Sequence, residues 1–308
     1  MKLSIITINY NGSSDTIKLL ESLKTQTDQN FSIIIVDNAS EETDFSALGG
    51  SQPEADQPLA GAKNPGGNNI LFIRNKENLG FSGGNNTGIK KALNSPADGS
   101  NWVVLLNNDT WVENGFLSAL KVKLEGLGGI VGIPLIEDGR TAYYGWVEWL
   151  KPTLKHGYNP PYSEYLRRNR NYYAIGGAIA INGNVFDKIG FLDEKYFLYF
   201  EDADFSLRTS RANISINFID EPKVWHHQVS KTNKKLGAPL LLRYHYRNAL
   251  YFNWKNGSWY IKILVWPWSF WIIKKQLWKI MFMYKQRESL AILSGVFDFY
   301  RNKMGKIV

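Results

Sequence analysis

The sequence predicts an α/β fold: a mostly parallel sheet flanked by helices, followed by a basic, tryptophan-rich helical C-terminal extension. Over the first two thirds of the chain, short apolar runs typical of buried strands alternate with segments of helical spacing. Hydrophobic residues make up 44% and charged residues 21%, which indicates a globular chain and excludes a disordered polymer. Its 308 residues allow two domains, which we place at residues 1–240 and 241–308.

The predicted elements follow in order along the chain. Residues 3–8 form a β-branched run that ends in a polar turn, and residues 15–25 then show helical spacing. Further strands are expected at residues 31–36, 70–74, 102–106, 174–181 and 216–219. Residues 45–69 are rich in Gly, Pro, Ala and Ser, which predicts a mobile surface loop. From residue 240 the pattern becomes helical and basic.

Polar side chains follow two of the predicted strands: Asp37 after the second, and Asn107, Asn108 and Asp109 after the fourth. Ligands of open α/β sheets bind at the carboxyl ends of the strands, so we expect a binding site there. A lone carboxylate at this place suits a hard divalent cation that also holds phosphate oxygens. An ordinary turn is the alternative reading of an Asn-Asp sequence.

Three carboxylates within four residues, Glu201, Asp202 and Asp204, follow an aromatic run. Like charges and apolar neighbours raise the pKa of such groups, so one of them would suit a general base. The alternative is a helix N-terminus, where acidic side chains cap free amides. Arg208 is expected to pair with this cluster.

A segment of glycine and asparagine, residues 78–88, opens a predicted helix at residues 89–93. Its amides would suit an anion, and a tight structural turn is an equal alternative. The glycine spacing is neither that of a dinucleotide-binding motif nor that of a P-loop. His226 and His227 are a further candidate metal element, whereas His156 and His245 are expected to be structural or surface residues.

The extension differs from the rest of the chain in charge. Residues 1–222 hold 20 Lys and Arg against 26 Asp and Glu, and residues 223–308 hold 16 against 2. Six of the eleven tryptophans lie within residues 241–308. This composition suits an anionic membrane surface, the alternative being a core or dimer interface. The apolar run at residues 259–273 is too short to span a bilayer and is broken by Lys262 and Pro267.

The chain has no cysteine, which excludes disulfides, thiolate nucleophiles and iron–sulfur clusters and leaves oxygen or imidazole as metal ligands. A reducing compartment is therefore expected. No signal peptide is expected, because Met1 and Lys2 run directly into a strand-like stretch.

Six segments occur in a characteristic order: SIITINYN at residues 4–11, VDNAS at 36–40, NLGF through Asn86 from 78, LNND at 106–109, FEDAD at 200–204 and VWH at 224–226. Together they resemble the family 2 glycosyltransferases, particularly the bacterial rhamnosyltransferase-like branch. The resemblance covers about residues 2–254 and implies the GT-A fold, with a Rossmann-like sheet.

The resemblance implies roles for individual residues. Asp37 would be the partner of the nucleotide base, with Asn9 and Asn11 beside it. The nucleotide-sugar pocket would be completed by Asn78, Gly80, Phe81, Asn85, Asn108 and Asp109. A divalent cation, Mn²⁺ or Mg²⁺, would be held by Asp109 and His226. Asp202 matches the catalytic base and Glu201 an acceptor-binding neighbour. Asn107 replaces the first Asp of the family's DxD motif, as is usual in this branch.

Two softer assignments follow from the same resemblance. The segment Tyr246, Arg247 and Asn248 resembles a family segment after the active site. Residues 231–235 would form a mobile flap over the diphosphate.

The implied activity is that of an inverting hexosyltransferase in the EC 2.4 class. It would move L-rhamnose or another hexose from a dTDP- or UDP-sugar to a saccharide or lipid-linked saccharide, in surface polysaccharide or cell-wall assembly. We expect a cytoplasmic protein, peripheral on the inner face of the plasma membrane, with a homo-oligomer as one role for the extension.

Two other classes of function compete with this reading. A nucleotidyltransferase would need a basic N-terminal loop, and residues 9–16 contain no Lys or Arg. A nucleic-acid-binding protein would use the basic, aromatic extension. That reading leaves the motif-rich front of the chain without a purpose, so no nucleic acid is expected as partner.

Overall fold

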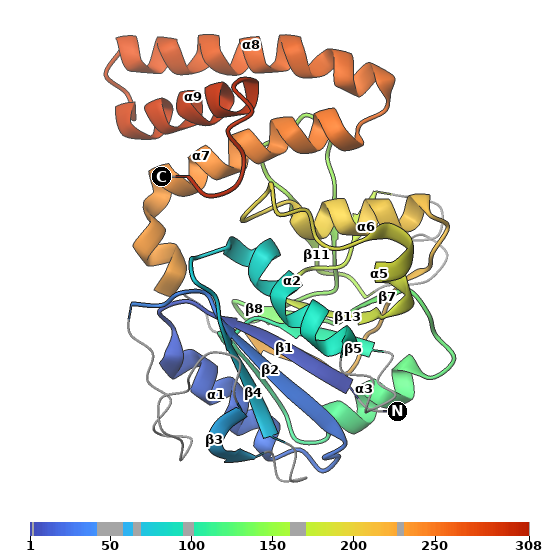
Figure 1. Ribbon diagram of the computed structural model, residues 1–308. Helices are drawn as coiled ribbons and strands as arrows, with labels where there is room; N and C mark the ends of the chain where they lie inside the picture. Colours follow the sequence, from blue (N-terminus) through green and yellow to red (C-terminus); the bar gives the residue numbers. More distant parts are fainter. Residues whose placement is uncertain are drawn as a thin grey trace.

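The computed structural model describes residues 1, 3–41, 58–63, 69–94, 102–160, 171–226 and 231–307. Their main feature is an eight-stranded sheet of order β14-β7-β13-β5-β1-β2-β4-β3, shown in Figure 1. Its strands are β1 (Leu3–Asn9), β2 (Phe31–Asp37), β3 (Pro58–Lys63), β4 (Asn69–Arg74), β5 (Trp102–Leu106), β7 (Ile130–Gly132), β13 (Ala178–Asn182) and β14 (Ile216–Phe218).

The helices of this domain cover both faces of the sheet. They are α1 (Ser13–Lys24), α2 (Gly80–Leu93), α3 (Phe116–Leu124), α5 (Asn184–Ile189) and α6 (Glu201–Arg211). Apolar residues of α1 and α3 pack with one side of the strands, and those of α2 and α5 pack with the other side. Burial on both faces explains the continuous Val- and Ile-rich runs in the sequence. The predicted α/β fold is confirmed.

The centre of the sheet is parallel, because β1 pairs in parallel with both β5 and β2, and β2 with β4. Their carboxyl ends therefore meet at one edge. The strand predicted at residues 174–181 begins later, at Ala178, and runs antiparallel between β5 and β7. The strand predicted at 216–219 is β14.

Two small sheets lie beside the main one, and the sequence did not predict their strands. One has the order β6-β15-β8-β9, and the other has the order β11-β10-β12. Their bounds are β6 (Thr110–Val112), β8 (Leu135–Glu137), β9 (Arg140–Ala142), β10 (Tyr144–Trp146), β11 (Lys155–Gly157), β12 (Tyr172–Tyr173) and β15 (Val224–His226). Because His226 pairs with Thr110, β15 brings His226 beside Asp109.

Helix α2 corrects one prediction. Its first nine residues, Gly80 to Gly88, were expected to be a loop before a helix at 89–93, but the helix begins at Gly80. The glycines serve close packing on the sheet. A Cβ on Gly84 would lie 3.1 Å from Ile8 Cδ1, and one on Gly88 would lie 2.5 Å from Ile6 Cγ2. Packing therefore outweighs the poor helix propensity of glycine.

The predicted loop at residues 45–69 is also corrected in part. Residues 58–63 of this stretch form β3, which pairs antiparallel with β4. The remaining residues of the prediction, apart from Asn69 at the start of β4, lie outside the described ranges.

The C-terminal extension is helical, as predicted. It consists of α7 (Lys231–Asn256), α8 (Trp259–Met281) and α9 (Gln286–Tyr300), which lie together at one end of the molecule in Figure 1. A separate apolar cluster joins them, with Leu250, Val265, Ile272 and Val296 at its centre. The predicted boundary at 240/241 falls inside α7, so we propose that α7 belongs to both domains.

Helix α8 passes through Pro267 without a break. A proline removes one backbone hydrogen bond, and buried contacts of Val265 and Ile272 with the other helices hold α8 on both sides of it. Within the described part of the chain, we find no helix whose length and apolar character would let it cross a membrane.

We expect Gly88→Ala to lower the free energy of unfolding by about 1–3 kcal/mol, because a Cβ would press α2 away from Ile6 on β1. Urea denaturation measures this. Gly128→Ala is the matched control, since a Cβ there meets nothing within 4 Å. Equal stability of both variants would contradict the close packing of α2.

Candidate functional site

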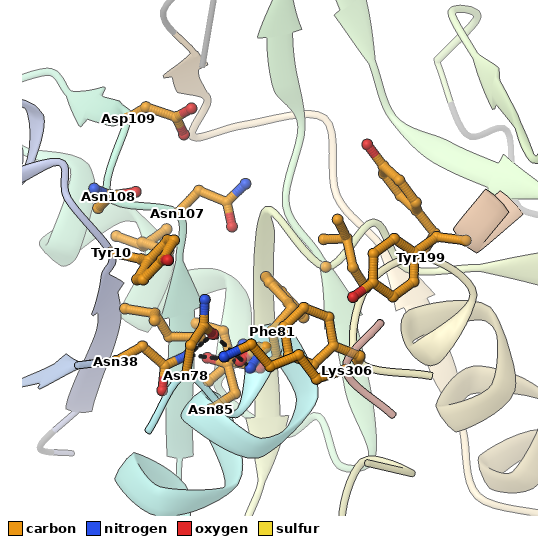
Figure 2. A pocket seen from close by; sticks show the side chains of 18 of the residues that line it. Tyr10, Asn38, Asn78, Phe81, Asn85, Asn107, Asn108, Asp109, Tyr199 and Lys306 are labelled. Carbon is orange, nitrogen blue, oxygen red and sulfur yellow. Dashed lines mark hydrogen bonds between the residues drawn. The ribbon is translucent and has the colours of Figure 1, made fainter. Parts of the chain in front are cut away.

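A pocket of about 290 Å³ opens at the carboxyl edge of the parallel strands. Figure 2 shows Asp109 and Tyr199 on opposite sides of it, with Asn38, Asn78 and Asn85 in the lower part of the view. The pocket is lined by Ile8, Tyr10, Asn38, Asn78, Gly80, Phe81, Asn85, Leu105, Leu106, Asn107, Asn108, Asp109, Gly176, Phe197, Leu198, Tyr199, His226, Leu240, Tyr244, Lys306 and Ile307.

Seven of the predicted site residues lie together in this lining. They are Asn78, Gly80, Phe81, Asn85, Asn108, Asp109 and His226. The other five, Asn9, Asn11, Asp37, Glu201 and Asp202, lie behind or beside the lining residues and do not form part of the wall.

A buried network fixes the loops at the ends of β1 and β2. Asp37 is fully buried, and its carboxylate accepts hydrogen bonds from Asn9 Nδ2 at 2.8 Å and from the backbone N–H of Ser40 at 3.1 Å. The Ser40 hydroxyl in turn accepts a bond from the N–H of Asn11 at 2.8 Å. Asp37 thus holds the loop that carries Tyr10 into the pocket. Direct contact of Asp37 with a base would require this loop to open.

Asn38 organises the start of α2. Its side-chain amide donates to the carbonyl of Gly80 at 2.8 Å, and its Oδ1 accepts a bond from Asn75 Nδ2 at 2.8 Å. Asn78 Oδ1 accepts from the N–H of Gly80 at 2.8 Å. The dashed lines in Figure 2 mark bonds of this group. The amides are therefore positioned before any ligand binds.

Asp109 and His226 face each other across β6 and β15. His226 Nε2 lies 3.2 Å from Asp109 Oδ1, yet this buried oxygen accepts no regular hydrogen bond from any described residue. Burial opposes protonation of His226, but the Asp109 carboxylate outweighs it and raises the pKa of His226. This pair of a buried carboxylate and an imidazole joins two groups that also serve as ligands of divalent cations. The described residues contain no group of three or more such side chains.

A second pair lies beside the first. His156 Nδ1 on β11 is 3.0 Å from Glu137 Oε2 on β8, the strand next to β15. Burial opposes protonation of His156, but Glu137 raises its pKa, and Asp202 contributes to the same effect. His156, expected to be structural or at the surface, is thus close enough to Asp202 to interact electrostatically.

Asp202 lies in the first turn of α6, directly behind Gly176. Its Oδ2 accepts a hydrogen bond from the N–H of Gly176 at 3.0 Å, and its Oδ1 accepts one from Ala203 at 2.8 Å. A Cβ on Gly176 would lie 3.2 Å from Asp202 Cβ and 3.3 Å from the Phe81 ring, so Asp202 and the pocket meet at this glycine. Burial raises the pKa of Asp202 above its ordinary value, although these hydrogen bonds and His156 oppose the rise.

Glu201 is buried more deeply than Asp202. Its Oε2 accepts no hydrogen bond from any residue in the described ranges. Burial and, next, the Asp202 carboxylate raise the pKa of Glu201 well above its ordinary value. The third acid, Asp204, accepts a bond from Arg208 Nε at 2.8 Å, which confirms the predicted pairing.

The loop before α6 forms the far wall of the pocket and has an unusual backbone. Phe197, Tyr199 and Phe200 have positive φ angles of 64°, 70° and 76°. Asn248 on α7 holds this loop, because its amide donates to the carbonyls of Tyr196, Leu198 and Tyr199 at 2.9, 2.7 and 3.2 Å. The predicted segment at residues 246–248 therefore supports the pocket from behind.

Several pocket residues were missed in the sequence. Tyr10 and Asn38 lie within recognised motifs, so the motifs themselves could have indicated them. Tyr199 and Tyr244 come to the site only through the fold. The ring of His245 stacks on that of Tyr199, and burial lowers the pKa of His245 to about 4. His227 lies outside the described residues, and residues 231–235 form the first turns of α7.

A mostly parallel sheet with helices on both faces, and a polar pocket where its central strands end beside a carboxylate and an imidazole, agrees with the GT-A fold that the sequence predicts. Residues 4–204 match the family model of glycosyl transferase family 2. The chain belongs to this family.

Relatives and solved structures agree with this assignment. The chain is 22% identical over 287 residues to N-acetylglucosaminyl-diphospho-decaprenol L-rhamnosyltransferase of Mycobacterium tuberculosis, covering 86% of this chain and 88% of the relative. It is 24% identical over 185 residues to dTDP-rhamnosyl transferase RfbF of Shigella flexneri, covering 56% and 62%. The chain is thus a rhamnosyltransferase-like member of the family.

The fold is similar to that of the mannosyltransferase PcManGT from Pyrobaculum calidifontis, solved in complex with GDP-Man and Mn²⁺. The TM-score is 0.53 at 12% identity, and the match covers 98% of this chain and 87% of that one.

We expect Asn248→Ala to lower kcat/KM more than 10-fold and stability by about 2–4 kcal/mol, because three loop carbonyls each lose a hydrogen bond from its amide. Steady-state kinetics and urea denaturation measure the two effects.

Asn253→Ala is the matched control on the same helix, since Asn253 is also buried but bonds to Leu150 and Ala249. It should lose stability while its kcat/KM stays within about 3-fold of wild type. If both variants were equally active when folded, the loop would not depend on Asn248.

Proposed function

We propose that the protein is an inverting glycosyltransferase that moves a hexose, L-rhamnose in the first instance, from a nucleoside-diphosphate sugar to an acceptor hydroxyl. The observation that carries this proposal is the meeting of Asp202 with the pocket at Gly176, in a lining that also includes Asp109 and His226. A candidate general base and a candidate cation-binding pair at one pocket match the two demands of sugar transfer.

The donor would lie along the floor of the pocket. In this arrangement the nucleotide base of the donor rests against Tyr10 and the loop that Asp37 anchors. Asn9 and Asn11 support that loop. The sugar lies toward Asn78, Gly80, Phe81 and Asn85. Asp109, with Asn108 beside it, faces the diphosphate. Small amide side chains and backbone groups suit the sugar part of the donor, which is neutral and rich in hydroxyl groups.

Asp109 and His226 are the residues that would hold a divalent cation, Mn²⁺ or Mg²⁺. The 3.2 Å approach of Asp109 Oδ1 to His226 Nε2 supports this fit, because it brings two possible ligands together. When bound, the cation supplies electrostatic stabilisation of the charge that develops on the leaving diphosphate.

Asp202 would accept the proton of the acceptor hydroxyl. Its raised pKa makes it a stronger base than an exposed aspartate, and the Gly176 and Ala203 amides keep the carboxylate in place. The acceptor oxygen attacks the anomeric carbon from the side opposite the leaving diphosphate, so the configuration inverts. Glu201 supports this end of α6 and is proposed to bind the acceptor.

The relatives suggest the substrates. One relative is named as a dTDP-rhamnosyl transferase and another as a rhamnosyltransferase of a diphospho-decaprenol lipid. We propose a dTDP- or UDP-sugar donor and a saccharide or lipid-linked saccharide acceptor in surface polysaccharide or cell-wall assembly.

The exposed side of α8 suggests where the reaction takes place. Trp259 and Phe270 are 75% and 69% exposed. Other large apolar side chains exposed on α8 and just after it are Tyr260, Ile263, Leu264, Trp266, Trp271, Leu277, Trp278, Met281, Phe282, Met283 and Tyr284. Lys274 and Lys275 lie exposed among them. This mixture suits an anionic bilayer surface, and we propose peripheral binding on the cytoplasmic face of the plasma membrane.

We expect Asp202→Asn to lower kcat by about 10²- to 10⁴-fold, because an amide cannot accept the proton. Nucleotide binding, measured by calorimetry with dTDP- and UDP-sugars and Mn²⁺ or Mg²⁺, should be unchanged. Asp109→Ala should instead weaken the metal-dependent binding of the donor, measured by the same calorimetry. Asp187→Asn, at an exposed position on α5, is the matched control and should behave as wild type.

The pH profile offers a further check on the same base. Because burial raises the pKa of Asp202, kcat/KM should fall on acidification at a pH above the ordinary aspartate range near 3.9.

An Asp202→Asn enzyme with wild-type turnover would overturn the catalytic assignment. Failure of every donor to bind the folded wild type would overturn the proposed function.

We expect full-length protein to float with anionic vesicles and to do so less with neutral ones. Phe270→Ser combined with Trp278→Ser should weaken binding by at least about 10-fold, because two large apolar contacts are lost. Val122→Ser, which removes an exposed apolar side chain from α3, is the control. Equal flotation of the two variants, or dimerisation through α8 without vesicle binding, would contradict membrane docking.

A further inference from the structure

The segment after α9 turns back toward the pocket. It is fastened at three places by backbone groups. The carbonyl of Lys303 accepts a bond from Arg247 Nη1 at 3.3 Å, the N–H of Gly305 donates to the carbonyl of Lys195 at 2.8 Å, and the N–H of Ile307 donates to the Tyr244 hydroxyl at 2.8 Å. These bonds hold residues 303–307 as a strap between α7 and the loop before α6.

The anchors of the strap are themselves rigid. Arg247 is 1% exposed, and its guanidinium also donates to the carbonyl of Tyr196 at 3.2 Å. Tyr244 is likewise buried, and its ring stacks on Phe197 at 5.4 Å. Since Phe197 also accepts a bond from the N–H of Phe81, the strap adjoins the start of α2. Lys306 is thereby placed in the pocket wall (Figure 2).

The charge of the pocket gives Lys306 its significance. Among the described residues that line the pocket, Lys306 is the one lysine or arginine, and Asp109 is the one carboxylate. Asn107 occupies the place where a second acid would bind a cation. A nucleoside diphosphate brings more than one negative charge, and Lys306 is the described lining residue whose side chain adds a positive charge to that of the proposed cation.

We propose that Lys306 binds the diphosphate of the donor and that the strap exists to present it. This inference rests on the proposed function, and it adds a specific binding residue outside the motifs of the family. The ammonium group would contact phosphate oxygens in the ground state. As the bond between the anomeric carbon and the phosphate oxygen breaks, its electron pair stays on that oxygen and the acceptor's proton passes to Asp202. Lys306 remains protonated and stabilises the added charge.

The test compares Lys306→Gln with Lys303→Gln. Both substitutions remove one positive charge from the strap. Lys303 does not line the pocket, and its anchoring group is the backbone carbonyl, which the substitution leaves intact. Calorimetric titration uses dTDP and UDP as probes, with thymidine and uridine as ligands that have the base but no phosphate. No acceptor is present, so a diphosphate on a lipid-linked acceptor cannot contribute.

We expect Lys306→Gln to weaken binding of the diphosphates about 10-fold and to leave nucleoside binding unchanged. Lys303→Gln should bind all four ligands as wild type does. Lys306→Arg should restore most of the affinity, because it returns the charge. The difference in diphosphate affinity between wild type and Lys306→Gln should also decrease as salt is raised, since the pocket is open to solvent.

Other results would overturn the inference. Equal affinity of Lys306→Gln and wild type for dTDP and UDP would do so. An equal loss of affinity in Lys303→Gln would do so as well, because it would show that only the overall charge of the strap matters. A raised KM for a lipid-diphosphate acceptor with unchanged dTDP and UDP affinity would place Lys306 at the acceptor instead. If wild type bound no nucleoside diphosphate, the proposed function itself would fail.

Discussion

The side chain of Asn248 is the contact on which the site most depends. Left-handed backbone costs a residue with a Cβ about 1–2 kcal/mol, and three residues of the loop before α6 adopt it within four positions. Such a loop cannot satisfy its carbonyls by regular pairing, so an outside donor must do so. Asn248 serves three of them at once. Because Asn248 lies on α7, the far wall of the pocket is complete only when the helical extension has docked.

A second buried network joins the same two parts and separates the roles of the three acids. Asp204 is fully buried and receives Lys255 Nζ at 2.8 Å and Asn256 Nδ2 at 2.7 Å, both from the last turn of α7. Removing one partner of a buried charge is strongly destabilising, at about 3–5 kcal/mol. Asp204 is therefore structural. Asp202, two residues earlier and beside Gly176, has no lysine or arginine partner in the described structure, which is consistent with its proposed role as a base.

The sequence predicted what depends on local pattern and missed what depends on distant pairing. The central parallel strands β1, β2, β4 and β5 were found because burial on both faces leaves uninterrupted apolar runs, whereas β3 and β7 of the same sheet were not predicted. The glycines of α2 were taken for a loop, since their purpose is visible only against Ile6 and Ile8 on β1. The strands of the small sheets have two or three residues, too few for an apolar periodicity to be visible in the sequence. One of them, β15, nevertheless sets the 3.2 Å approach of His226 to Asp109. Lys306 has no motif, because 80 residues separate it from His226 and only the strap brings it back.

The division of charge along the chain acquires a structural meaning from these contacts. The domain that carries the pocket is acidic over residues 1–222, which would repel an anionic donor at long range. The basic extension supplies α7 behind the pocket, Lys255 to the buried acids and Lys306 to the lining. It also carries the exposed tryptophans of α8, and α9 packs against both α7 and α8. If the proposed function holds, one helical unit would both complete the electrostatics of the site and present the face suited to a membrane, which would tie binding of the donor to the placement of the enzyme.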